Sequence, residues 1–303
     1  MKPYIIISLS IILANSPLQL LSQGCSDAGV CTIQSIKTNE PYDSSAITHN
    51  TLDAGFSFGL SQYEVVVLTP FIEYTRNMGK KVSVTGRFSA GYRSGELANL
   101  FDISDVTISS SYAFVRRMKL VGGVKLPLNN GNLKKNGMPL PMNYQSSLGT
   151  YDLILGLSYT LKRFSFIAGF QQPLTQNNNS FQASNYPVDA PENKYYSTNG
   201  YHRYSDALLR ISYYPVDNKK LRLATSLLPI FHTQNDRYTD STGNTVIIEQ
   251  SQGLTLNITA ILQYKIKKDR ILEFTAGAPA IARKVRPDGL SKFGIGIEYK
   301  YLF

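Results

Sequence analysis

From about residue 52 to the C-terminus, hydrophobic and polar residues alternate with a period of two, and turn-forming residues interrupt the alternation at intervals. A period of two predicts β-strands that have one apolar and one polar face. The last stretch shows the pattern most clearly. Its apolar face carries Phe293, Ile295, Ile297, Tyr299, Tyr301 and Phe303, and its polar face carries Lys292, Gly294, Gly296, Glu298 and Lys300. We therefore predict an all-β fold.

The alternating stretches number about twelve, and each is close to the 9–11 residues that a tilted strand needs to cross a bilayer. The predicted strands are 53–61, 64–75, 81–93, 104–115, 118–128, 150–161, 164–174, 205–216, 220–233, 252–266, 271–282 and 290–303. An even number of strands is typical of single-chain bacterial outer-membrane barrels. A sheet in lipid must also close, because an open edge would leave backbone groups unpaired.

The predicted connections alternate in length. Short links fall at Asn77–Lys80, Arg116-Arg117, Lys162-Arg163, Asp217–Lys220 and Lys267–Asp269, and long ones at 94–103, 129–149, 175–204 and 234–251. Outer-membrane barrels have short periplasmic turns and longer outer loops. The pattern predicts a transmembrane antiparallel up-and-down β-barrel over residues 52–303, with both termini in the periplasm.

Composition agrees with this prediction. Hydrophobic residues make up 43% of the chain and charged residues 17%, whereas soluble globular proteins carry about 25% charged residues. No run of 18 apolar residues follows the N-terminus, so the sequence offers no transmembrane helix. A soluble β-sandwich is the alternative, and it accounts less well for this composition.

The N-terminus has the features of a secretory signal peptide. Lys2 precedes the apolar stretch Tyr4–Leu13, and Ser22-Gln23-Gly24 supplies small residues near a cleavage site. We predict a signal peptide over residues 1–24 and a periplasmic N-terminal segment over residues 25–51. Acylation of Cys25 is an alternative, although Gln23 occupies a position at which lipoprotein signals have a small residue.

The chain has two cysteines, Cys25 and Cys31, both in this N-terminal segment. In an oxidising periplasm, two cysteines this close are expected to form a small-loop disulfide. A metal site would need further Cys or His ligands nearby, and the segment has none. A redox-active pair is a weaker alternative because the spacing is not C-x-x-C.

A short motif recurs on three predicted strands. An Asp is followed six residues later by Ser-Tyr at Asp105 and Ser111-Tyr112, at Asp152 and Ser158-Tyr159, and at Asp206 and Ser212-Tyr213. The strand parity places each Asp inside the barrel at its outer rim. It places each Tyr on the lipid face near the periplasmic interface, where an aromatic girdle is expected.

The net charge of +10 arises from 31 Lys and Arg against 21 Asp and Glu. Most of the excess falls at the predicted short turns, which argues against nucleic-acid binding. A second group faces the predicted lumen. Its basic members include Arg87, Arg93, Lys119, Lys125, Arg210, Arg222 and Lys265, and its acidic members include Glu73, Asp105, Asp152, Asp206 and Glu273. These residues either neutralise one another in ion-pair networks or line an anion-preferring pore.

Catalysis is not expected. Serine hydrolysis needs a Ser beside a His that a third group orients, and the chain has three histidines, His49, His202 and His232. We interpret the polar residues around them as ordinary loop residues. We predict no catalytic residues, no cofactor and no metal site, because no phosphate-loop or zinc-binding motif is present.

Three segments resemble uncharacterised Bacteroidetes outer-membrane barrels: Leu140–Ile154, Gly24–Ile33 (GCSDAGVCTI) and Phe170–Leu174. More remotely, the architecture is similar to the barrels of phenol meta-cleavage pathways and to the fatty-acid and aromatic-hydrocarbon outer-membrane transporters. The Gly-x-Gly-Asp of those families appears here as Asp102–Asp105, without the glycines, and their Asn-Pro-Ala hatch motif is missing. The resemblance implies a transporter-like barrel without identifying a hydrophobic substrate.

Two functions therefore compete: uptake of a small solute through the lumen, and a non-conducting barrel that anchors a partner of the cell envelope. For loop 175–204 three roles stay open: a lid, a plug or a disordered surface loop. The terminal Phe303 resembles the signal that the outer-membrane assembly machinery reads. The expected partners are thus outer-membrane lipid, that machinery and an unidentified small solute, and not nucleic acid.

Overall fold

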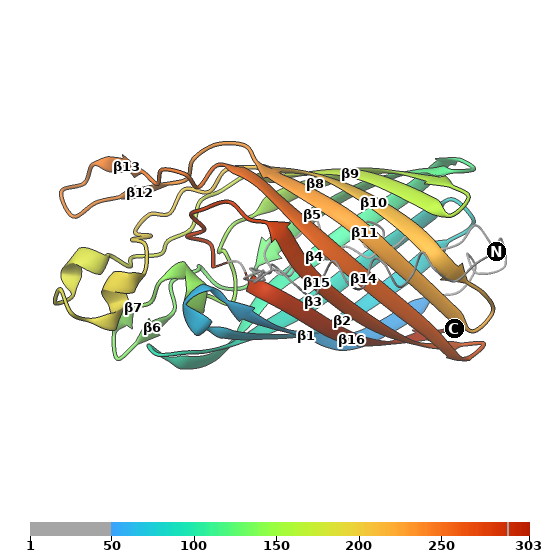
Figure 1. Ribbon diagram of the computed structural model, residues 1–303, viewed down its shortest axis with the longest axis horizontal. Coiled ribbons are helices and arrows are strands. Elements are labelled where there is room, and N and C mark those ends of the chain that lie inside the picture. The colour runs from blue at the N-terminus through green and yellow to red at the C-terminus, as the bar shows by residue number, and fades with distance from the viewer. Residues whose placement is uncertain (1–49, 290) are drawn as a thin grey trace, which may run out of the picture.

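The computed structural model describes residues 50–289 and 291–303, which form a closed barrel (Figure 1). Twelve antiparallel strands pair in the order β1-β2-β3-β4-β5-β8-β9-β10-β11-β14-β15-β16, and β16 pairs with β1 to close the sheet. The strands are β1 Thr51–Ser61, β2 Val66–Met78, β3 Val82–Ser94, β4 Asn99–Val115, β5 Met118–Pro127, β8 Asp152–Leu161, β9 Phe164–Pro173, β10 Asp206–Asp217, β11 Leu221–His232, β14 Gly253–Lys267, β15 Arg270–Ile281 and β16 Ser291–Leu302. The predicted fold class and strand number are confirmed.

One strand boundary was predicted wrongly. A long connection was expected over 94–103, but β4 begins at Asn99 and pairs with β3 up to Ser94. The register shifts between Phe88 and Ala90, as at a β-bulge. The extra residue of the bulge lies in β4, between Ile103 and Val106. A bulge breaks the period of two, so the alternation that continues to Val115 begins only after β4 has started.

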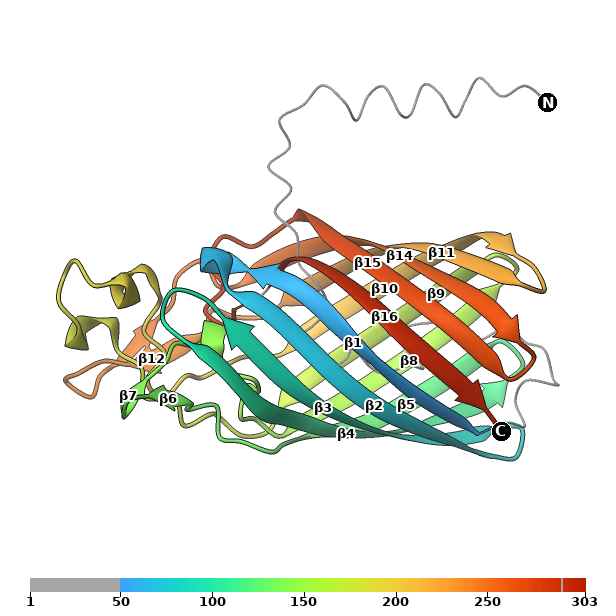
Figure 2. The ribbon, with the colours of Figure 1, turned by 90° about the horizontal axis from the view of Figure 1, so that it is seen from below.

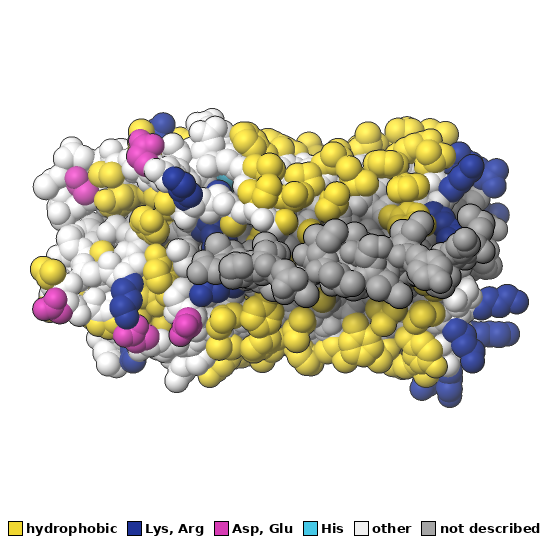
Figure 3. Space-filling model, viewed as in Figure 1, with side chains coloured by type: hydrophobic (Ala, Val, Ile, Leu, Met, Phe, Trp, Pro, Cys, Tyr) yellow, Lys and Arg dark blue, Asp and Glu magenta, His cyan; other side chains and the backbone are white. Residues whose placement is uncertain are grey.

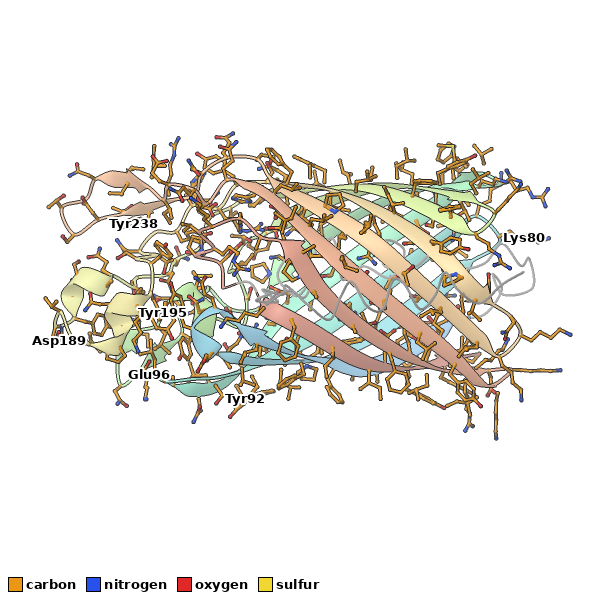
Figure 4. The ribbon with its side chains drawn as sticks, in the orientation of Figure 1. Lys80, Tyr92, Glu96, Asp189, Tyr195 and Tyr238 are labelled. Atoms are coloured by element: carbon orange, nitrogen blue, oxygen red, sulfur yellow. The ribbon has the colours of Figure 1, made fainter. Side chains whose placement is uncertain are left out.

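The two ends of the barrel differ. We call the end with the short turns, at 79–81, 116–117, 162–163, 218–220 and 268–269, the turn end, and the opposite end the loop end. The backbone of Asn50 hydrogen-bonds to that of Phe303 at the turn end. Figure 4 shows Lys80 at this end, and Glu96, Asp189, Tyr195 and Tyr238 at the loop end. The tilt of the strands between the two ends is clearest in Figure 2.

The outer surface of the barrel is apolar. Side chains on the outward face of the strands, such as Ile72, Leu120, Leu155, Ile258 and Ile295, are between 47% and 56% exposed. Figure 3 shows hydrophobic atoms covering the barrel wall and Lys and Arg side chains gathered at the turn end. In water this surface would be an unfavourably large apolar patch, whereas in a bilayer it faces lipid.

Aromatic side chains concentrate near the turn end. Tyr112, Tyr159 and Tyr213 of the recurring motif all lie on the outer face there. The ring of Tyr213 packs 5.1 Å from that of Phe164, measured between centroids. Such a belt of Tyr and Phe around the barrel suits the interface between the lipid hydrocarbon and the headgroups.

Two small hairpins at the loop end were not predicted: β6 (Lys134–Lys135) with β7 (Met138–Pro139), and β12 (Arg237–Thr239) with β13 (Thr245–Ile247). The first turns through Asn136-Gly137, both at positive φ, which is the preferred sequence of a tight hairpin. Short 3-10 turns complete the loops: η2 Gln62–Glu64, η3 Met142–Tyr144, η4 Ala183–Asn185 and η5 Pro191–Lys194. None of the helical elements within the described residues is long and apolar enough to cross a membrane.

The predicted signal peptide and the Cys25–Cys31 disulfide lie outside the described residues. Both stay predictions.

Candidate functional site

The inner wall of the barrel is lined by paired charges. The strand register places Glu73 of β2 directly opposite Arg87 of β3, and their side chains form an ion pair of 3.3 Å. The guanidinium of Arg87 also lies 3.6 Å from the ring centre of Phe71. The position of Arg87 is therefore held both by its carboxylate partner and by a cation–π contact.

A second pair spans β5 and β8. Lys125 Nζ lies 2.8 Å from Asp152 Oδ2, and both side chains are almost fully buried. The amide of Gln171, from the next strand, donates a hydrogen bond to the same carboxylate. Asp152 Oδ2 thus has a cationic partner on one neighbouring strand and a neutral hydrogen-bond donor on the other.

A third group lies toward the turn end, where three carboxylates, those of Asp53, Glu273 and Glu298, gather around one lysine. Lys300 Nζ is 3.1 Å from both Glu273 and Glu298, which face each other across β15 and β16. Asp53 is the register partner of both Lys300 and Glu73. Without the lysine, the close carboxylates would repel one another.

The remaining predicted lumen residues are placed as follows. Arg93, Arg210 and Asp206 are buried, Asp105, Lys119 and Arg222 are half-buried, and Lys265 is exposed near the turn end. The Arg222 guanidinium stacks on Tyr214 at 4.2 Å. The predicted residues therefore follow the inner wall along its whole length instead of converging on one point.

The loop between β5 and β8 folds back into the mouth of the barrel. Residues 140–148 and 150 are all buried, and we call residues 140–150 the inward segment. Leu140 and Tyr144 pack in one apolar cluster with Phe181 and Tyr195. Met142 packs in another, with Leu148 and residues of the neighbouring loops. Apolar contacts on two sides therefore hold the segment in place.

Hydrogen bonds tie the polar residues of the inward segment to the barrel wall. Ser147 Oγ donates to Asp105 Oδ1 at 2.6 Å, and Ser146 Oγ donates to the carbonyl of Ile103 at 3.0 Å. The backbone N–H of Leu97 donates to Tyr144 Oη at 3.0 Å. The segment then returns to β8 through Gly149, at φ +67, where a side chain would collide with the backbone of Asn130.

A pocket lies beneath the inward segment, between it and the inner wall. From the wall it is lined by Thr69, Arg87, Ser89, Arg93, Ser104, Asp105, Thr107 and Lys125, and from the loops by Met142, Gln145, Ser146, Ser147, Leu148 and Asp288. None of these lining residues, all of them in the described part of the chain, is aromatic. Hydroxyl, amide and charged groups predominate, so the pocket suits a polar solute.

A buried network joins the barrel rim to the loops. Each ring nitrogen of His232, the last residue of β11, faces a carboxylate: Nδ1 lies 2.7 Å from Asp206 and Nε2 lies 2.8 Å from Asp236. Because a carboxylate oxygen only accepts, this arrangement calls for a proton on both nitrogens. The Tyr201 hydroxyl and the N–H of Tyr204 also donate to Asp236. We call these residues the rim network.

The loop between β15 and β16 continues this network. Asp288 lies 2.6 Å from Arg283 and 3.5 Å from Arg203, which also pairs with Asp206. Burial opposes ionisation of Asp288, but the two guanidiniums outweigh it and hold the pKa of that carboxyl below its usual range. Arg203 therefore links the rim to this loop.

The rim network is poorly suited to hydrolysis. A catalytic serine needs an imidazole nitrogen that can take its proton, and both nitrogens of His232 are engaged by carboxylates. Ser251, a serine beside Asp236, instead accepts from the N–H of Asp236 and donates to the carbonyl of Ile248. The geometry serves to hold loops together.

Sequence reasoning missed several of these residues. Asp53 follows the inward parity of β1, so the alternation itself was a usable signal for it, as it was for Lys300, which the sequence already placed on the polar face of the last strand. Arg203, Asp236 and Asp288 carried no such signal, because they lie in loops without periodicity. The inward segment coincides with the stretch 140–154 that had been singled out only by resemblance.

A closed antiparallel barrel with an apolar outer wall, an aromatic belt and a polar, charged interior defines the class: the chain is an outer-membrane β-barrel. Neither a protein-family model nor a curated protein sequence matches it.

Similar solved structures are distant. They include the KdgM porin, with 9% identity, a TM-score of 0.44 and coverage of 84% of this chain and 99% of that chain. The CymD monoaromatic hydrocarbon channel has 10% identity, a TM-score of 0.45 and coverage of 94% and 98%. The translocator domain of the autotransporter NalP from Neisseria meningitidis has 9% identity, a TM-score of 0.49 and coverage of 84% and 89%. Assignment to the class rests on the chain's own strands and surface.

Proposed function

We propose that this barrel is a channel for small polar solutes, with a mild preference for anions. The observation that carries the proposal is the pocket beneath the inward segment, because its lining offers hydroxyl, amide and charged groups to a solute in the mouth. A pathway for aromatic hydrocarbons would be expected to present apolar and aromatic side chains instead. The polar lining of this pocket therefore differs from what the remote resemblance to hydrocarbon transporters implies.

The preference for anions follows from the charges of the pocket. Arg87, Arg93 and Lys125 line it against Asp105 and Asp288, so the basic groups exceed the acidic ones by one. Basic side chains in a pore favour anions. The preference is mild because Arg87 and Lys125 are each partly neutralised by an acidic neighbour.

Planar-bilayer recordings test this proposal. Under a KCl gradient, the purified barrel should conduct, and its reversal potential should indicate modest selectivity for chloride. Cation selectivity would refute the anion preference. Absence of conductance, together with a co-purifying envelope protein, would favour the alternative of a non-conducting anchor.

We also propose that Phe303 is part of the signal recognised by the outer-membrane assembly machinery. Its ring packs 5.6 Å from that of Tyr301 and 6.3 Å from that of Tyr74, on the outer face at the turn end. Deletion of Phe303 should reduce the amount of folded barrel in the membrane, measured as the heat-modifiable band on electrophoresis. Deletion variants that accumulate to normal levels in this form would contradict the proposal.

A further inference from the structure

Buried donor groups without acceptors gather in the loop between β15 and β16 and around it. Arg286 is 5% exposed, and its Nε and Nη1 have no hydrogen-bond partner in the part of the chain that the structure describes. The same holds for Arg283 Nε, Arg203 Nη1 and Asn143 Nδ2, all on side chains that are at least nine-tenths buried. Buried polar groups are normally paired, so such a set indicates a missing acceptor.

The acidic group of this loop, Asp288, is already engaged in ion pairs. Asp288 pairs with Arg283 and Arg203, and its Oδ1 has no hydrogen-bond partner among residues 50–289 and 291–303. Within the described residues, Arg286 forms no ion pair. Burial, the largest cause, lowers the pKa of Arg286 below its usual range, although Asp288 opposes the shift. A buried cation that is not fully compensated is costly, and an added anion would relieve that cost.

The residues that carry these donors lie on one turn or beside it. The N–H of Gly289 donates to the carbonyl of Arg286 at 3.2 Å. A Cβ placed on Gly289, at φ +77, would lie 2.8 Å from Asn143 Cα and 3.4 Å from Asn143 Nδ2. Asp288 ties Arg283 and Arg203 to the same turn and also lines the pocket. The site is thus formed by the loop, the inward segment and the rim network.

We propose that this cluster binds the carboxylate or phosphate group of a solute that enters the mouth, with Arg286 as its main anchor. The planar, forked guanidinium donates charge-assisted hydrogen bonds to carboxylate and phosphate groups in fixed directions, a geometry that an ammonium cannot offer. Asn143 adds a neutral donor from the inward segment. The inference deepens the proposed function, and it rests on that function only for the route by which the anion arrives.

Binding is tested on the refolded full-length chain in detergent, by thermal unfolding in the presence of phosphate or acetate, with potassium chloride at matched ionic strength as the reference. We expect a saturable rise in Tm with at least one of the two anions and none with chloride. Arg286→Gln should weaken the apparent affinity by about ten- to a hundredfold, the range expected for losing hydrogen bonds to a charged group. Lys284→Gln removes an exposed charge from the same loop and should bind like the wild type.

Equal loss in Arg286→Gln and Lys284→Gln, or equal stabilisation by chloride, would overturn the inference and indicate general screening. If Arg286→Gln does not fold, Arg286→Lys keeps the charge without the forked geometry and should show intermediate affinity; wild-type affinity in that variant would also overturn the inference. A barrel that binds phosphate but does not conduct would refute the channel and leave the anion site standing. A barrel that conducts but shows no saturable anion binding would overturn the anion site and leave the channel standing.

Discussion

Replacing residues 140–148 with a short Gly-Ser linker should raise the single-channel conductance of the reconstituted barrel several-fold. The inward segment is buried in the mouth, where Ser146 and Ser147 bond to the wall. Its removal would widen the path without altering any of the twelve strands. The measurement is the conductance of single insertions in a planar bilayer, with strand content checked by circular dichroism.

A point substitution gives a milder version of the same test. Tyr144 is fully buried and holds the segment against the β3–β4 turn through Leu97. Tyr144→Ala should make the loop 128–151 more sensitive to protease and the current noisier, because large-to-small changes at buried aromatics typically cost about 3–5 kcal/mol. Tyr196→Ala, at an exposed tyrosine, serves as the matched control. Unchanged conductance in both the linker variant and Tyr144→Ala would contradict the role of the segment as a constriction.

Lys125→Met should lower the free energy of unfolding by about 3–5 kcal/mol, because it leaves the buried carboxylate of Asp152 without its cation. Unfolding in urea measures the change. Circular dichroism is the probe, because the chain has no tryptophan for fluorescence. Lys119→Met changes a half-buried lysine on the same strand, and its effect should be much smaller.

The double variant Lys125→Met with Asp152→Leu separates charge from packing. Replacing both members of a buried pair by apolar residues is often neutral, so the double variant should recover most of the stability lost in Lys125→Met. A double variant as unstable as the single one would show that packing around Lys125, and not the unpaired charge, is responsible.

The alternation along the chain was sufficient to determine the barrel. Each strand crosses a bilayer with one face in lipid and the other in the lumen, so the period of two is present in every strand. It located all twelve strands and the inward parity of Lys125, Asp152 and Glu273. It failed at β4, where the bulge between Ile103 and Val106, opposite Phe88–Ala90 of β3, interrupts the period.

Only the tertiary structure showed which charges meet and what occupies the mouth. Parity places a residue inside the barrel, but its partner depends on the register between strands, as for Lys300 with Glu273 and Glu298. The inward segment and the anion site depend on contacts between loops far apart in sequence, such as Asn143 with Gly289 and Arg203 with Asp288. Those loops have no repeating pattern, because their conformation is set by packing against one another and not by a membrane with two fixed faces.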